Sequence, residues 1–140
     1  MLRSLARGAG VTAAALALGS VFTASGAFAA DYQGTPERLN AAAYYGSVDV
    51  LARQTHGLKA KLTKVDGSPV AGLPVTFTVA GEKTTLCEAT TDTNGNAECQ
   101  NSPLPLGIPT VKLVTAGYDA TFDGNARYAP VSAHNSVGAL

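Results

Sequence analysis

Two segments of the sequence alternate strictly between apolar and polar side chains, and this constrains the fold more than any other feature. The first is residues 58–62 (LKAKL) and the second is residues 75–79 (VTFTV). Successive side chains of a β-strand point to opposite faces, so each segment would present one apolar and one hydrated face. Strands of this kind bury their apolar faces against one another, in two packed sheets or a closed barrel.

Turn residues separate further short apolar runs along the chain. Residues 66–69 (DGSP), 81–83 (GEK) and 92–95 (DTNG) predict turns, because Gly and Asn tolerate a left-handed backbone and Pro ends strand pairing. We expect the remaining strands at residues 85–91, 96–100, 111–115, 118–122 and 131–137. Residues 36–45 fit one helical turn and an extended first strand equally well. About seven short antiparallel strands predict an all-β sandwich, with a small barrel as the alternative.

Both cysteines of the chain, Cys87 and Cys99, flank the predicted turn at residues 92–95. They are an even number of residues apart, so on two paired strands they can share one face of the sheet. Cross-strand neighbours lie close enough for a disulfide. We therefore predict a hairpin disulfide between Cys87 and Cys99, which would stabilise the domain by roughly 3 kcal/mol if chain entropy alone is considered.

The segment between the cysteines also leaves metal and redox interpretations open. Asp92, Asn94 and Asn96 are spaced like calcium ligands. An EF-hand loop, however, requires Gly sixth and Glu twelfth, whereas Gly95 falls fourth and Pro103 twelfth. A zinc site would need more Cys or His nearby, and a redox pair would favour C-x-x-C. The residues favour a structural disulfide, and we expect no metal and no cofactor.

The beginning of the sequence has the layout of a secretory signal peptide. Arg3 and Arg7 precede an uncharged run that ends in the small-x-small tripeptide AFA. We predict a signal peptide at residues 1–29, cleaved near Ala29/Ala30, and hence a secreted, extracellular product. A retained membrane anchor is the alternative, because the uncharged run is long enough to span a bilayer.

The charge of the predicted mature chain excludes one class of partner. Without Arg3 and Arg7, ten basic residues fall to eight against ten acidic ones, a net charge of about −2. Nucleic-acid binding requires clustered Lys and Arg, and the sequence has no such cluster. We therefore expect no nucleic-acid partner. We also expect no membrane contact after signal cleavage, since no second long apolar run follows.

Three stretches resemble the bacterial immunoglobulin-like repeat of invasins, adhesins and other exported surface proteins. They are residues 66–79 (DGSPVAGLPVTFTV), 90–99 (TTDTNGNAEC) and 105–133 (PLGIPTVKLVTAGYDATFDGNARYAPVSA), in the order that the family shows. The resemblance covers roughly residues 58–137 and implies one immunoglobulin-like sandwich at residues 58–140. An N-terminal segment with the first strand, residues 30–57, would precede it. The resemblance also implies that Tyr128 packs at an end of the sandwich.

Few residues of the sequence are candidates for a functional site. His56 and His134 stand in polar settings without a nucleophile motif, so we expect no enzyme. In the Pro-rich stretch NSPLPLGIP, Leu104, Leu106 and Ile108 fit either an exposed contact loop or a plug for the open end of the sandwich.

The sequence as a whole predicts a secreted, non-catalytic immunoglobulin-like module for extracellular binding or surface attachment. Its partner would be an extracellular protein or a polysaccharide, bound by loops or by a free sheet edge. Two alternatives stay open. One is a small secreted inhibitor of an extracellular enzyme, with residues 101–109 as bait, and the other is a structural component of a coat or matrix.

Overall fold

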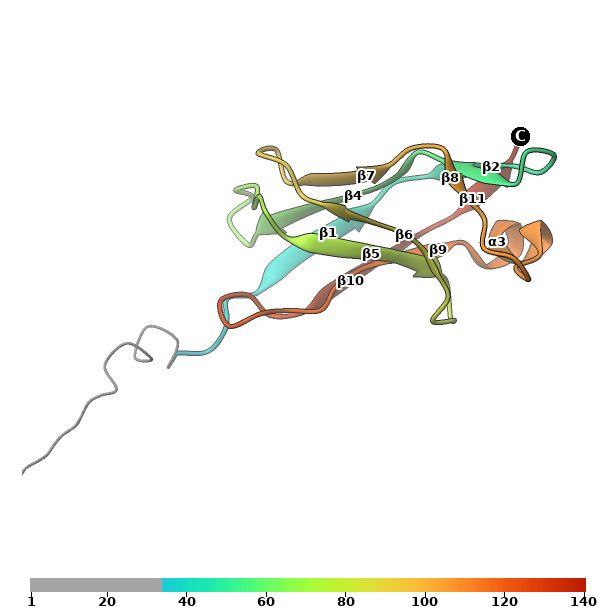
Figure 1. The fold of residues 1–140 in the computed structure, drawn as a ribbon. Helices are drawn as coiled ribbons and strands as arrows, with labels where there is room; N and C mark the ends of the chain where they lie inside the picture. Colours follow the sequence, from blue (N-terminus) through green and yellow to red (C-terminus); the bar gives the residue numbers. More distant parts are fainter. Residues whose placement is uncertain (1–33) are drawn as a thin grey trace, which may run out of the picture. The chain divides into compact units, whose positions relative to one another are not determined.

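The computed structural model describes residues 34–140, so the predicted signal peptide at residues 1–29 lies outside the described residues. Pro36–Leu140 forms one compact unit in which β-sheets pack face to face around an apolar core (Figure 1). The all-β sandwich predicted from the sequence is confirmed. Three strands of this unit, rather than one, precede residue 58.

The described residues contain eleven strands and one short helix. In chain order they are β1 (Leu39–Ala43), β2 (Gly46–Asp49), β3 (Gln54–His56), β4 (Leu58–Lys64), β5 (Pro74–Val79), β6 (Thr85–Thr90), β7 (Asn96–Cys99), β8 (Ser102–Pro103), α3 (Thr110–Ala116), β9 (Tyr118–Phe122), β10 (Val131–Asn135) and β11 (Val137–Ala139). Within residues 36–45, Leu39–Ala43 forms the strand β1, and no residue of this range is helical.

The strands form two layers. One layer is the sheet β10-β9-β5-β6, and the other begins with the sheet β1-β4-β7. A third sheet, β11-β2-β3-β8, continues the second layer without a change of register. Ala43 lies opposite Ala60, and Ser47 lies opposite His56, four residues further along each strand. Residues 39–64 are thus one long hairpin, interrupted at Gly57, with its tip at residues 50–53.

The last strand passes from one layer to the other. β10 pairs with β9 in the first layer, whereas β11 pairs with β2 in the second. The β11–β2 pair is parallel, which departs from the antiparallel arrangement expected for all strands. After the chain crosses between layers, the direction of β11 is set by its path from β10, and this direction is the same as that of β2.

The core consists of the apolar sides of the alternating segments. Val75, Phe77 and Val79 on β5 are almost completely buried, as their alternation predicts, while Thr76 and Thr78 on the same strand are only half-buried. The same alternation holds on β4 and β9. Burial of one side chain of this size stabilises a fold by about 1.5–3 kcal/mol, so these three strands supply much of the hydrophobic stabilisation.

The strand predicted at residues 111–115 is wrong, because these residues form the helix α3. Pro109 has an extended backbone and precedes the helix, and Gly117 ends it with φ of 82° and an N–H bonded to the Leu113 carbonyl. Leu113 is the buried residue of α3, whereas Val111 is exposed. One buried side chain is compatible with the period of a strand and with that of a helix. The helix is instead indicated by its boundaries, since Pro109 is typical of a helix start and Gly117 of a helix end.

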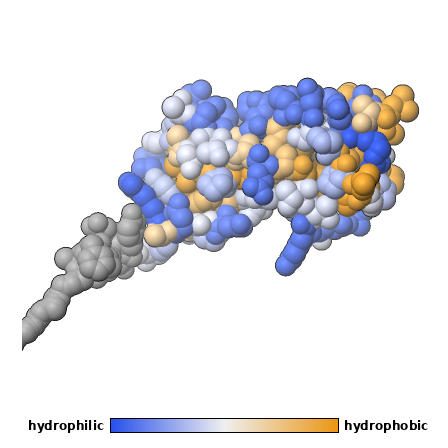
Figure 2. Space-filling view, in the orientation of Figure 1, coloured by the Kyte–Doolittle hydropathy of each residue, from blue (hydrophilic) through white to orange (hydrophobic). Residues whose placement is uncertain are grey.

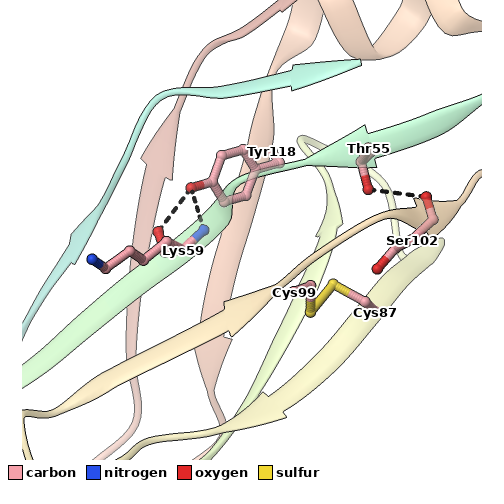
Figure 3. The surroundings of a disulfide bond; sticks show 6 residues. All are labelled: Thr55, Lys59, Cys87, Cys99, Ser102 and Tyr118. Atoms are coloured by element: carbon pink, nitrogen blue, oxygen red, sulfur yellow. Dashed lines mark hydrogen bonds between the residues drawn. A yellow bond between two sulfur atoms is a disulfide. The ribbon is translucent and has the colours of Figure 1, made fainter. Parts of the chain in front are cut away.

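The disulfide between Cys87 and Cys99 is present, but it does not lie within a hairpin (Figure 3). Cys87 belongs to β6 and Cys99 to β7, and these two strands lie in different sheets. The predicted turn at residues 92–95 exists, with Gly95 at φ of 81°, but it carries the chain from one layer to the other. Two strands that follow a tight turn can pair or separate, and the sequence of the turn does not distinguish these outcomes.

Candidate functional site

Segments that are far apart in the sequence meet at one end of the sandwich. The tip of the long hairpin, residues 50–53, touches the loop before α3, where Arg53 accepts a hydrogen bond from the N–H of Leu104 at 2.9 Å. The end of β11 joins the same region, since the N–H of Leu140 donates to the Val48 carbonyl at 2.8 Å. In Figure 1 the hairpin tip, α3 and the C-terminus all lie at the right-hand end of the molecule.

This end carries a concentration of exposed apolar side chains, which we call the apolar end. Its exposed members are Val50, Leu51, Leu106, Val111 and Leu140, and the half-buried Ile108 lies in the same loop as Leu106. Leu51 is 97% exposed and Leu106 is 96% exposed, and Leu140 and Val111 follow at 73% and 65%. Figure 2 shows apolar surface gathered at this end of the molecule. Grouped apolar exposure of this kind marks interaction surfaces, whereas single exposed apolar residues need no explanation.

Arg53 connects the two loops of the apolar end. Its guanidinium donates to the carbonyl of Ile108 at 3.0 Å and to that of Pro105 at 3.4 Å. The backbone of Arg53 has φ of 54°, which is uncommon for a residue other than Gly and costs about 1 kcal/mol or more. The hydrogen bonds to the loop offset this cost, so Arg53 fixes the position of the loop that carries Leu106.

The predicted contact loop divides between the two interpretations that the sequence left open. Leu104 is buried in the core and acts as the plug. Leu106 points into solvent, and Ile108 is half-buried against the core. Leu106 and Ile108 line an open hollow of about 370 Å³ together with Arg53 and Pro109. Leu106 and Ile108 are therefore available for contact, and Leu104 is not.

The histidines do not assemble a reactive centre with a nucleophile. The Nδ1 atom of His134 lies 2.9 Å from a carboxylate oxygen of Asp119, and Nδ1 of His56 lies 2.6 Å from the side-chain oxygen of Asn101. Both pairs sit on polar surface. Within residues 34–140, no three His, Cys, Asp or Glu side chains are grouped so that they could hold a metal ion.

The segment weighed as a calcium loop is a turn held by its own side chain. The carboxylate of Asp92 accepts hydrogen bonds from the N–H groups of Asn94 and Asn96, at 2.8 and 3.0 Å. This arrangement is an Asx turn, which Asp forms readily because its short side chain reaches the backbone two residues on. The spacing that suggested metal ligands is thus explained by the turn.

Comparison with known proteins gives no assignment. The sequence matches no protein-family model, and no curated protein matches it significantly. In the described part of the chain, no helix has the length and apolar character needed to cross a membrane. The candidate site therefore depends on the geometry of the apolar end.

Sequence reasoning found one loop of the apolar end and missed the other. The run Val50-Leu51-Ala52 stands between Asp49 and Arg53, so it was visible as an apolar segment at a potential loop. Its exposure follows only once residues 39–64 are known to form one hairpin. Val111 was assigned to a strand, which concealed its position on the exposed side of a helix.

Proposed function

We propose that this protein is a secreted, non-catalytic module for extracellular binding or surface attachment, a single-copy relative of the bacterial immunoglobulin-like domains that its sequence resembles. The contact surface is the apolar end. The single observation that carries the proposal is the convergence of Leu51 and Leu106, both almost fully exposed, from loops more than fifty residues apart.

The energetics of these side chains support a role in contact. Exposed leucines gain about 1.5–3 kcal/mol each when they leave water, which corresponds to roughly tenfold or more in affinity per residue. Since neither Leu51 nor Leu106 packs into the core, the fold itself gains nothing from their apolar character. The proposed function therefore predicts that they affect binding and not stability.

The test is retention of the protein on the cell envelope of the organism that makes it. Protein purified from the culture medium is compared with its Leu51→Ser/Leu106→Ser variant by sedimentation with the envelope fraction. We expect the variant to bind at least tenfold more weakly, with an unchanged melting temperature, because surface substitutions typically alter stability by no more than about 0.5 kcal/mol.

Val65 offers a matched control. It is 69% exposed and lies in the turn after β4, at the end of the sandwich opposite the apolar end (Figure 1). Val65→Ser removes exposed apolar surface of similar size and is expected to leave retention unchanged. Equal retention of the wild type and the Leu51→Ser/Leu106→Ser variant would contradict the proposed function.

A further inference from the structure

We propose that the outer face of the sheet β10-β9-β5-β6 binds a neutral saccharide in a polar hollow of about 470 Å³. The hollow lies over β5 and β9, the two central strands of that sheet, and no residue of the apolar end lines it. The inference therefore goes beyond the proposed function, and either one can fail without the other. Small-molecule sites in proteins typically have volumes of about 300–1,000 Å³, so the hollow is large enough for one or more sugar rings.

The floor of the hollow is a grid of four polar side chains on paired strands. Thr76 lies opposite Thr121, and Thr78 lies opposite Asp119. All four side chains are half-buried and line the hollow. Opposed side chains in a sheet are about 5 Å apart, and alternate residues along a strand are about 7 Å apart. The grid therefore presents hydrogen-bonding groups at positions that the strands fix, and the stiff χ1 angle of Thr limits their movement further.

A β-bulge adds a further hydroxyl group at the edge of the hollow. β5 and β6 pair in one register as far as Phe77, and the register then shifts by one residue, so that Thr78 lies opposite Thr85 rather than Leu86. Without this shift Leu86 would share the outer face with Thr78, because opposed residues lie on the same side of a sheet. With it, Leu86 is buried and Thr85 lines the hollow. Bulges redirect side chains in this way and are frequent next to active sites.

The hydroxyl groups of Thr76 and Thr78 have unused hydrogen-bonding capacity. Within residues 34–140, neither hydroxyl is hydrogen-bonded to another group of the chain, although both side chains are half-buried. The buried Thr55 and Thr91, by contrast, each bond through their hydroxyl to the backbone of another segment. A hydroxyl can donate one hydrogen bond and accept two. The floor of the hollow can therefore bind a hydroxyl-rich ligand without breaking a hydrogen bond of the fold.

The charges around the hollow almost cancel. Three carboxylates line it, those of Glu82, Asp119 and Asp123, together with the ammonium group of Lys83. Lys112 lies outside the hollow but forms an ion pair with Glu82. With histidine neutral, three carboxylates against two ammonium groups leave a net charge of −1. A charge this small attracts polycations only weakly at physiological salt, and the carboxylates repel anions. The hollow therefore favours a neutral ligand.

A saccharide matches these groups better than other neutral ligands do. Carboxylates only accept hydrogen bonds, ammonium groups only donate them, and hydroxyls do both, so sugar hydroxyls can pair with all three. An apolar ligand would leave the half-buried hydroxyls without partners. An extended peptide cannot add to the sheet here, because β5 and β9 are already paired on both sides. A metal ion would need a group of three ligands, and the described residues form no such group.

The expected binding is weak, because it depends on hydrogen bonds alone. No aromatic side chain is among the residues that line this hollow in the described part of the chain, so a sugar ring has nothing to stack on. Each hydrogen bond adds little net affinity, since the ligand and the protein both give up hydrogen bonds to water. We expect a dissociation constant on the order of 1 mM or higher for a single sugar ring.

The experiment follows the backbone amide resonances of the ¹⁵N-labelled protein, purified from the culture medium, while ligands are added. The probes are glucose, galactose, mannose and N-acetylglucosamine, each up to about 100 mM so that millimolar binding saturates. Glucuronate and spermidine serve as the anionic and the cationic comparison. We expect saturable shifts at Thr76, Thr78 and Thr121 with at least one of the four neutral sugars, and no saturable shift at these residues with glucuronate or spermidine.

Two threonine substitutions give a matched comparison. Thr76→Val/Thr78→Val removes two hydroxyls and keeps the branched shape of the side chains, so the dissociation constant should rise roughly tenfold. Thr90→Val removes a hydroxyl of the same kind from an exposed position at the end of β6, outside the hollow, and should leave binding unchanged. The dispersion of the amide resonances reports in the same spectra whether each variant is folded.

Several outcomes would overturn the saccharide inference. They are the absence of saturable shifts with all four sugars, saturation by spermidine or glucuronate at the same residues, and equal sugar binding by the wild type and Thr76→Val/Thr78→Val. If that double variant does not fold, Thr85→Val at the exposed rim replaces it and should weaken binding about threefold. The Leu51→Ser/Leu106→Ser variant should bind sugar like the wild type, so failure of the proposed function and failure of this inference are distinguishable.

Discussion

The side chain of Tyr118 connects the two layers of the sandwich through a single hydroxyl group. Its ring is buried beside Phe77, with the ring centroids 5.8 Å apart. Its hydroxyl lies within hydrogen-bond distance of the Lys59 carbonyl, at 2.9 Å, and of the Tyr44 carbonyl (Figure 3 shows the Lys59 contacts). The sequence singled out Tyr128 as the structural tyrosine, and Tyr128 is indeed buried, but Tyr118 has the central position.

Replacement of Tyr118 by Phe should destabilise the protein by about 1–3 kcal/mol, because the part-buried carbonyls of Lys59 and Tyr44 lose their shared hydrogen-bond donor. Burial raises the pKa of the Tyr118 hydroxyl above its usual value, and hydrogen bonds from the backbone of Lys59 and Tyr44 oppose this only in part. A raised pKa means that the Tyr118 hydroxyl keeps its proton to a higher pH in the folded state than in the unfolded state. The contribution of the protonated hydroxyl to the free energy of unfolding is therefore complete below the unfolded pKa of about 10, and it is lost as pH rises through the folded pKa.

Melting temperatures of the wild type and Tyr118→Phe, measured between about pH 8 and pH 12, check this prediction. The wild-type curve should fall more steeply above pH 10, so that the two curves converge. Parallel curves over the whole range would show that ionisation of Tyr118 does not contribute to alkaline unfolding.

At the scale of secondary-structure elements, the disulfide closes one open side of the sandwich. β6 and β7 are edge strands of two different sheets, and Cys87 and Cys99 join them with their Cα atoms 6.6 Å apart. On the other side, the chain itself crosses between layers from β10 to β11, and the Asn135 side chain donates to the Ala43 carbonyl. One side is thus closed by covalent chemistry and the other by the path of the backbone.

The Cys87→Ser/Cys99→Ser variant should melt roughly 10 °C or more below the wild type. Closure of a loop of this length is worth about 3 kcal/mol, and each 1 kcal/mol shifts the melting temperature by several degrees in a domain of this size. Thermal unfolding followed by circular dichroism measures the shift. A reducing agent should lower the melting temperature of the wild type and leave that of the variant unchanged, and an equal response of both would contradict the prediction.

At the scale of the whole molecule, the sandwich includes the strands before residue 58. β4 lies between β1 and β7, so the long hairpin of residues 39–64 supplies two of the three strands of that sheet. Leu39 on β1 and Val48 on β2 belong to the same buried core as Phe77 on β5. The compact unit therefore begins at Pro36 and not at residue 58.

Two truncations should separate these boundaries. A chain that begins at residue 36 should melt within about 2 °C of a chain that begins at residue 30, because it keeps every strand and the whole core of the described residues. A chain that begins at residue 58 should show no cooperative unfolding transition, since β4 would lose its partner β1 and the core would be open on one side. Denaturant unfolding followed by two independent probes gives the measurement. Cooperative folding of the shorter chain would contradict the assignment.

Much of the fold follows from patterns that span only a few residues. The alternation at residues 58–62 and 75–79 specified strands, since side-chain direction in a strand has a period of two. Asp66, Gly67 and Gly95 marked turns, and each lies in one. The helix α3 was not predicted, because it buries a single side chain, Leu113, and one buried residue does not define a helical repeat of apolar positions.

The sequence by itself determined that this is an all-β sandwich with Cys87 and Cys99 close together, because strand period, turn geometry and short loop length act locally. Only the tertiary structure decided that the disulfide joins two layers and that the loops carrying Leu51 and Leu106 meet at one end. These facts depend on the register between strands distant in the chain and on one arginine that holds two loops together. Such long-range pairings result from the packing of the whole core, and no short stretch of residues encodes them.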